Sequence, residues 1–180
     1  MDLKPYFGYG FLRDRKSIAT VIGRDPGEGR SGVIQGYKLA YQNLDQVPEK
    51  IRPILEKSWG GEFKAYTLRK GQGIVAGTIW MLTDEDIKKI HIWEFVGGWR
   101  NSESGVATSN TGEQVNVMVT KVPDDQPVKE FVDGILYETR INQEGKRIYD
   151  QIISEHETET LSHIRLQLME LSGKSTYGTQ

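Results

Sequence analysis

The sequence contains no cysteine among its 180 residues. Because disulfides, thiolate nucleophiles and cysteine-ligated zinc or iron–sulfur centres all require cysteine, these are excluded. Histidine is scarce, with three residues, and the one His-Glu pair, at His156, lacks the second histidine of a zinc motif. The net charge of -2 provides no excess of positive charge for a polyanion. We therefore expect no metal site and no nucleic-acid partner.

Long hydrophobic runs are also missing. No stretch approaches the roughly 18 apolar residues of a membrane helix, and residues 1–6 are too polar for the apolar part of a signal peptide. We expect a soluble, cytoplasmic protein with no membrane partner. The length suits one domain, which we place at residues 1–155, followed by a C-terminal helical extension and frayed tail at residues 156–180. The oligomeric state stays open.

Glycines and short apolar runs rich in Val, Ile, Tyr and Trp alternate from residue 6 to residue 122. This texture predicts strands. The expected strands are Tyr6–Tyr9, Gly32–Gln42, Glu62–Leu68, Ile74–Met81, Trp99–Ser104 and Gln114–Val122. Many short strands with few helices between them favour an α+β fold with a small, mainly antiparallel β barrel and flanking helices.

Helices are predicted where the apolar spacing changes to about 3.6 residues. The expected helices are Thr83–Trp93, a short piece at Pro48–Lys57, Pro127–Leu136 and Glu144–Leu171. The first has Thr83 as N-cap, with Asp86 placed to accept from the N–H of the cap. A glycine-rich G-x-G-x-x-G at residues 27–32 precedes an expected strand instead of a helix, so we interpret it as a connection and not as a nucleotide loop.

Glu94 is the first candidate functional residue. The apolar spacing of Ile87 and Ile90 in the Thr83 helix continues to Glu94 and directs a carboxylate toward the core. An ionised carboxylate that is buried without partners costs several kcal/mol, on the order of the stability of a domain. The group must therefore be hydrogen-bonded, protonated or functional, unless the helix ends one residue earlier and Glu94 faces solvent.

The second candidate is the run Tyr9-Gly10-Phe11-Leu12-Arg13, directly after the first expected strand. A Tyr-Gly step lets the backbone turn tightly and present N–H groups, which can hold a carboxylate or a developing oxyanion. Taken alone, the same pattern is equally typical of a strand that ends in a turn.

The two candidates together resemble the gamma-glutamylcyclotransferase superfamily, which includes AIG2-like proteins. Tyr9–Arg13 is similar to its Tyr-Gly-x-Leu-Arg signature, and Ile90–Glu94 to its Leu-Asp-x-x-Glu. Further pieces in the family's order are Val75–Trp80, Thr83–Asp86, Gly98–Arg100, Val115–Val122 and Pro127–Leu136 with Tyr149. The resemblance spans about residues 6–153. Phe11, His91 and Phe95 stand where the family usually has a small hydroxyl residue, aspartate and glycine.

The resemblance implies an intramolecular aminoacyl transfer. The α-amine of a gamma-glutamyl group attacks its own γ-carbonyl, which gives 5-oxoproline and a free amine. Glu94 would be the catalytic base, and the backbone of Tyr9, Gly10, Phe11 and Leu12 would bind the substrate; no cofactor is needed. A second hypothesis is a non-catalytic small-molecule binding protein on the same fold, because Phe11 could narrow the site. A partner-binding scaffold that uses the long C-terminal helix is the third.

Overall fold

A closed β barrel forms the body of the protein in the computed structural model, which describes residues 2–59 and 63–135. Its strands are β1 Lys4–Gly8, β2 Arg30–Gln42, β3 Ala65–Leu82, β4 Asn101–Ser109, β5 Gln114–Lys121 and β6 Glu130–Val132. Their order is β3-β1-β5-β4-β2-β6, and β2 also pairs with β3, so β1 to β5 close on themselves. Among the described strands, the β1–β5 pair is parallel and the others are antiparallel. The small, mainly antiparallel barrel is confirmed.

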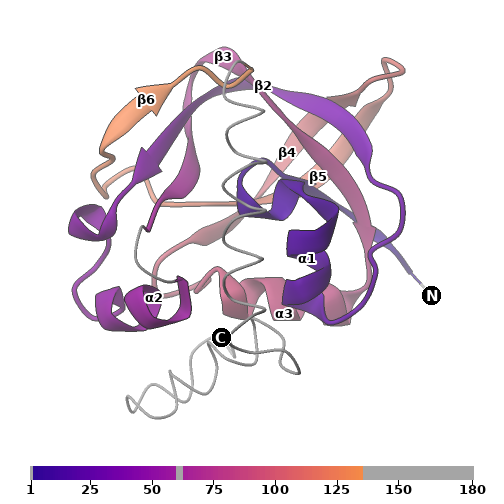
Figure 1. Ribbon diagram of the computed structural model, residues 1–180. Helices are drawn as coiled ribbons and strands as arrows, with labels where there is room; N and C mark the ends of the chain where they lie inside the picture. The colour runs from indigo at the N-terminus through magenta and orange to yellow at the C-terminus, as the bar shows by residue number, and fades with distance from the viewer. Residues whose placement is uncertain (1, 60–62, 136–180) are drawn as a thin grey trace.

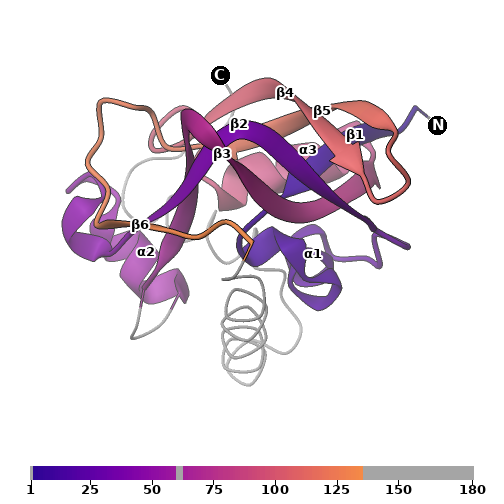
Figure 2. The same cartoon turned by 90° about the horizontal axis from the view of Figure 1, so that it is seen from above.

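Three helices accompany the barrel in the described part of the chain: α1 Arg15–Ile22, α2 Arg52–Trp59 and α3 Asp84–Trp93. Two short 3-10 turns, η1 Phe11–Arg13 and η2 Leu44–Gln46, complete the elements. Figure 1 shows the helices together on one side of the strands, and Figure 2 shows the barrel from above. Side chains alternate along each strand, so Phe7 and Ile79 fill the barrel while Tyr6 and Trp80 pack toward the helices.

The strands expected at Glu62–Leu68 and Ile74–Met81 are one continuous strand, β3. It pairs with β2 on both sides of a bulge, where the register shifts between Gln35 and Tyr37. Gly36 lies in this bulge with φ 83°, a conformation that glycine adopts without strain. The glycines at Gly71 and Gly73 therefore accompany a bend in a paired strand and do not end it.

The predicted start of α3 is confirmed. The Thr83 side chain accepts from the N–H of Asp86, and the Asp86 carboxylate accepts from the N–H of Thr83. Arg24, beyond the end of α1, also pairs with Asp86. Helix α1 itself was not predicted, although its signals are present. Asp14 is its N-cap and Gly23, with φ 79°, is its C-cap.

The helix predicted to start at Pro127 is wrong for residues 127–135. This segment is extended, and its β6 pairs with residues 39–41 of β2. Strand β4 covers β2 only at residues 32–34, so the edge farther along β2 is open to β6. The N–H of Lys129 donates to the carbonyl of Tyr41 at 2.8 Å, and the N–H of Ala76 donates to the carbonyl of Gly134 at 3.1 Å. Backbone pairing with the sheet thus replaces the helix, and Phe131 stays 53% exposed.

The helix expected at Glu144–Leu171, together with Leu136, Tyr149 and the domain boundary at residue 155, lies outside the described residues. Within the described residues, no helix combines the length and the apolar character needed to cross a membrane.

Candidate active site

Glu94 follows directly after the last residue of α3. Its N–H donates to the carbonyl of Ile90 at 2.8 Å, which keeps the chain helical up to this point. The residue is 9% exposed, and Ile87 and Ile90 on the same side of α3 are buried. The apolar spacing therefore predicted the burial of Glu94 correctly.

Arg100 supplies a partner for this carboxylate that we did not predict. Its Nε lies 2.9 Å from Glu94 Oε2, and both side chains are largely buried. The Nε–H is not aligned for a hydrogen bond, so the contact is an attraction between charges. Burial alone would lower the pKa of Arg100, but the charge of Glu94 and the Tyr9 hydroxyl raise it above its ordinary value. The attraction between the two charges offsets part of the desolvation cost of burying each of them.

A tight turn brings Arg100 back to Glu94. The carbonyl of Phe95 accepts from the N–H groups of Gly98, Trp99 and Arg100 at 3.1, 2.8 and 3.2 Å. Phe95 has φ 51°, the left-handed region that glycine adopts more easily. Glycine adopts this conformation without strain, which gives a physical reason why the family that the sequence resembles usually has glycine at the position of Phe95. In this chain the turn carries a buried phenylalanine instead.

The loop after β1 is held close to the barrel. A side chain at Gly8 would meet the carbonyl oxygen of Leu12 at 2.3 Å, so only glycine permits this backbone approach. Trp80 Nε1 donates to the carbonyl of Leu12 at 2.8 Å, and Thr78 Oγ1 donates to that of Arg13 at 3.0 Å. Among the described residues, the N–H groups of Gly10 and Leu12 donate to no other residue. Gly10 is half-buried and Leu12 is 2% exposed, so a ligand has to enter the loop to reach these two N–H groups.

Buried hydrogen bonds connect the start of the loop to Glu94. Arg100 Nη1 donates to the Tyr9 hydroxyl at 3.3 Å, and that hydroxyl donates to the carbonyl of Thr120 at 2.5 Å. The Tyr6 hydroxyl lies 3.2 Å from Thr120 Oγ1. Tyr9 and the Glu94 carboxylate thus contact the same guanidinium, although 85 positions separate them in the sequence.

The Tyr9 hydroxyl makes a pH-dependent contribution to stability. Burial raises its pKa to about 12, compared with about 10 in an unfolded chain. The native state therefore holds this proton more tightly, and the stabilisation is complete below about pH 10 and is lost as the pH rises toward 12. Urea unfolding between about pH 9 and pH 11.5 should show a steeper loss of stability in the parent than in Tyr9→Phe, by about 2 kcal/mol over this range. Tyr6 is present in both proteins, so its titration cancels in the comparison. An equal loss of stability with pH in the two proteins would therefore contradict this expectation.

The predicted site residues come together in part. Tyr9 approaches Glu94 through Arg100, and the ring of Phe11 packs on Trp93 with centroids 5.5 Å apart. Arg100, which completes the site, follows Glu94 by only six positions and could have been found as the nearest following cation. His91 is half-buried on α3, and its Nε2 has no hydrogen-bond partner among the described residues.

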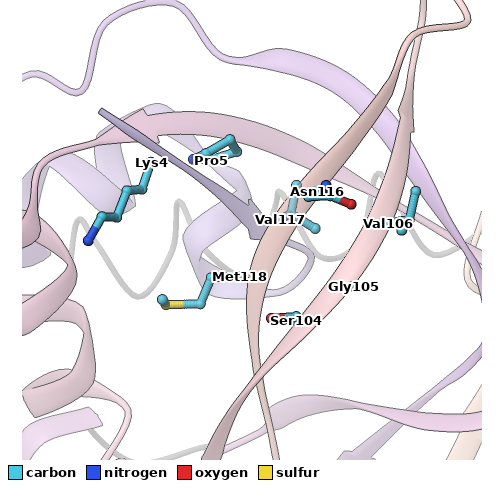
Figure 3. A pocket seen from close by; sticks show the side chains of 8 residues that line it. All are labelled: Lys4, Pro5, Ser104, Gly105, Val106, Asn116, Val117 and Met118. Carbon is cyan, nitrogen blue, oxygen red and sulfur yellow. The ribbon is translucent and has the colours of Figure 1, made fainter. Parts of the chain in front are cut away.

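A surface hollow elsewhere on the barrel lies apart from this site. Figure 3 shows it between β1, β4 and β5, near the single register pair that joins β1 to β5. Lys4 is its one titratable residue, and Asp84 pairs with that ammonium group at 2.5 Å. This hollow therefore offers neither a base nor an acid. Within residues 2–59 and 63–135, no three metal-ligating side chains gather in one place.

The fold is shared with solved structures at low sequence identity. A gamma-glutamyl cyclotransferase matches with a TM-score of 0.58 and 15% identity, over 87% of this chain and 85% of that one. An uncharacterized protein from Homo sapiens matches with a TM-score of 0.57 and 14% identity, over 87% and 86%. A protein from Arabidopsis thaliana matches with a TM-score of 0.55 and 12% identity, over 88% and 86%. No family model and no curated protein sequence matches the chain. The protein therefore has the gamma-glutamyl cyclotransferase-like fold over most of its length.

Proposed function

We propose that the protein is a gamma-glutamyl cyclotransferase-type enzyme that converts a gamma-glutamyl amine or peptide into 5-oxoproline and a free amine. The observation that carries the proposal is the buried carboxylate of Glu94, which contacts the same guanidinium as Tyr9 at the start of the loop. The fold of a gamma-glutamyl cyclotransferase supports it. We also propose that the protein acts in the cytoplasm, as expected from its sequence.

The chemistry requires one base and one anion site. The α-amine of the substrate is an ammonium group near neutral pH, and it attacks only after it loses a proton. Glu94 accepts this proton, the amine nitrogen bonds to the γ-carbonyl carbon, and the bond from that carbon to the leaving nitrogen then breaks. Glu94 returns the proton to the leaving nitrogen as this bond breaks. The ring nitrogen then gives its surplus proton to water, and the released amine takes up one proton from water to become an ammonium ion, so that all protons are accounted for. Since nucleophile and electrophile belong to one molecule, the enzyme mainly has to hold the substrate in a reactive shape.

The loop supplies the binding part of the mechanism. The N–H groups of Gly10 and Leu12 are available for the substrate carboxylate or for the oxyanion that develops on the γ-carbonyl. There is little room for a side chain at position 10, because a Cβ added to Gly10 would lie 3.3 Å from the Cβ of Tyr66. A side chain at this position would therefore push against Tyr66, whose backbone carbonyl accepts from Arg100.

A panel of gamma-glutamyl amines, gamma-glutamyl dipeptides and glutathione tests the proposal through release of 5-oxoproline. We expect turnover of at least one class. Binding measured by calorimetry without turnover of any member would favour the non-catalytic binding protein. The packing of Phe11 on Trp93 is the observation behind that alternative, because Trp93 is the last residue of α3 and directly precedes Glu94 in the chain. In that case Phe11→Ser tests whether the phenylalanine ring narrows the site, because serine is a small hydroxyl residue of the kind usual at this position in the family that the sequence resembles.

A further inference from the structure

The guanidinium of Arg100 contacts three separate parts of the chain. Nε lies 2.9 Å from Glu94 Oε2 at the end of α3. Nη1 donates to the Tyr9 hydroxyl after β1 at 3.3 Å, and Nη2 donates to the carbonyl of Tyr66 in β3 at 2.8 Å. The group is 5% exposed and lies over the ring of Trp99, 4.5 Å from its centroid. Every nitrogen of the guanidinium therefore faces a defined partner.

These contacts require the shape of arginine. A guanidinium is planar and presents its N–H groups in a fixed fork, whereas a lysine ammonium is a single point charge. A lysine at this position could keep the charge next to Glu94 but could not reach Tyr9 and Tyr66 at the same time. Stacking on Trp99 further restricts rotation of the plane. The orientation of Glu94 relative to the loop thus depends on one rigid group.

We propose that Arg100 is the positioning residue of this site: it holds the carboxylate of Glu94 in register with the Tyr9–Leu12 loop and leaves Oε1 to accept the proton of the substrate. This inference rests on the proposed function. Oε2 faces the guanidinium, and Oε1 has no partner among the described residues. Tyr9 extends the same arrangement into the loop, because its hydroxyl accepts from Arg100 and donates to Thr120.

The positive charge and the orientation have separable effects. The positive charge of Arg100 compensates the negative charge of the buried Glu94 carboxylate. Orientation of the base affects the rate instead, and a displacement of about 1 Å can reduce turnover by about 10²-fold. Arg100→Lys keeps the charge and removes the fork, whereas Arg100→Gln removes the charge.

Kinetics of these variants tests the inference. In Arg100→Lys we expect kcat to fall about tenfold or more while KM changes by less than about threefold. In Arg100→Gln, which also removes the positive charge beside Glu94, kcat should fall at least as far as in Arg100→Lys. Tyr9→Phe should lower kcat less than Arg100→Lys, because it removes one of the three contacts. An unchanged kcat in folded Arg100→Lys and Arg100→Gln variants would overturn the inference.

A double-mutant cycle separates positioning from a merely structural role. If Arg100 acts through Glu94, adding Arg100→Lys to Glu94→Gln should lower the residual turnover by less than about twofold. A full additional tenfold loss would show that Arg100 does not act through Glu94. Thermal melts check folding, and if Arg100→Gln fails to fold, Arg100→Lys and Tyr9→Phe still decide the question.

A double-mutant cycle on stability distinguishes failure of this inference from failure of the proposed function. Urea denaturation of the parent, Glu94→Gln, Arg100→Lys and the double variant measures the coupling between the two side chains without turnover. Because the two groups are in contact, the double variant should lose less stability than the sum of the two single losses. An inactive parent that shows this coupling would refute the proposed function and retain the Arg100–Glu94 contact. Additive losses would refute the coupling whether or not the parent is active.

Discussion

Glu94→Gln should reduce the release of 5-oxoproline by about 10²-fold or more, the usual contribution of a positioned base. Glutamine keeps nearly the same shape but is a poor proton acceptor. Ligand binding should survive, because the N–H groups of Gly10 and Leu12 are unaffected. The melting temperature should fall, since Arg100 would remain buried without a negative partner.

The matched control for this prediction is Glu85→Gln, the same chemical change in the exposed first turn of α3. It should leave turnover, affinity and melting temperature close to those of the parent. Turnover by 5-oxoproline assay, affinity by calorimetry and melting should be compared for the three proteins. Turnover in Glu94→Gln equal to that of the parent would refute the role of Glu94.

Phe95→Ala should lower the free energy of unfolding by about 3–5 kcal/mol. The side chain is 0% exposed and packs in the core between the barrel and the helices. Truncation leaves a cavity next to the turn that returns Arg100 to Glu94. Phe131→Ala is the control, because Phe131 is 53% exposed and its truncation should change stability by less than about 0.5 kcal/mol.

A comparison of Phe95→Gly with Phe95→Ala tests whether the backbone of Phe95 is strained. Its φ of 51° costs about 1 kcal/mol for a residue with a Cβ, and glycine is free of this strain. Although Phe95→Gly removes more atoms than Phe95→Ala, we expect it to be at least as stable in urea denaturation. A Phe95→Gly protein that is clearly less stable than Phe95→Ala would mean that this conformation carries no strain.

Local signals in the sequence predicted several features correctly. The capping pair Thr83 and Asp86 lies three residues apart, so helix geometry alone brings its donors and acceptors together. The burial of Glu94 followed from the spacing of Ile87 and Ile90 in the same helix. The alternation of Val115, Val117 and Val119 predicted β5 for the same reason, because strand geometry sends alternate side chains to opposite faces. Each of these features depends on neighbours within a few residues.

Other features depended on neighbours that are distant in the sequence. The apolar residues from Pro127 onward have helical spacing, yet the open edge of β2, about 90 residues earlier, pairs with this segment as β6. Similarly, Gly71 and Gly73 suggested an interruption, but pairing with β2 carries β3 through them. The propensity of a short segment is weak compared with a full set of backbone hydrogen bonds to a neighbouring strand.

The sequence by itself determined the barrel class, the capped helix and the interior position of the Glu94 carboxylate, because these follow from period, caps and composition. Only the tertiary structure decided what that carboxylate meets. The turn at Phe95 brings Arg100 back to it, and closure of the barrel places Tyr9 and Tyr66 on the same guanidinium. The meeting of one guanidinium with residues from the end of α3, from β3 and from the loop after β1 has no periodic signature, since it depends on strand register and on side-chain geometry at contact distance.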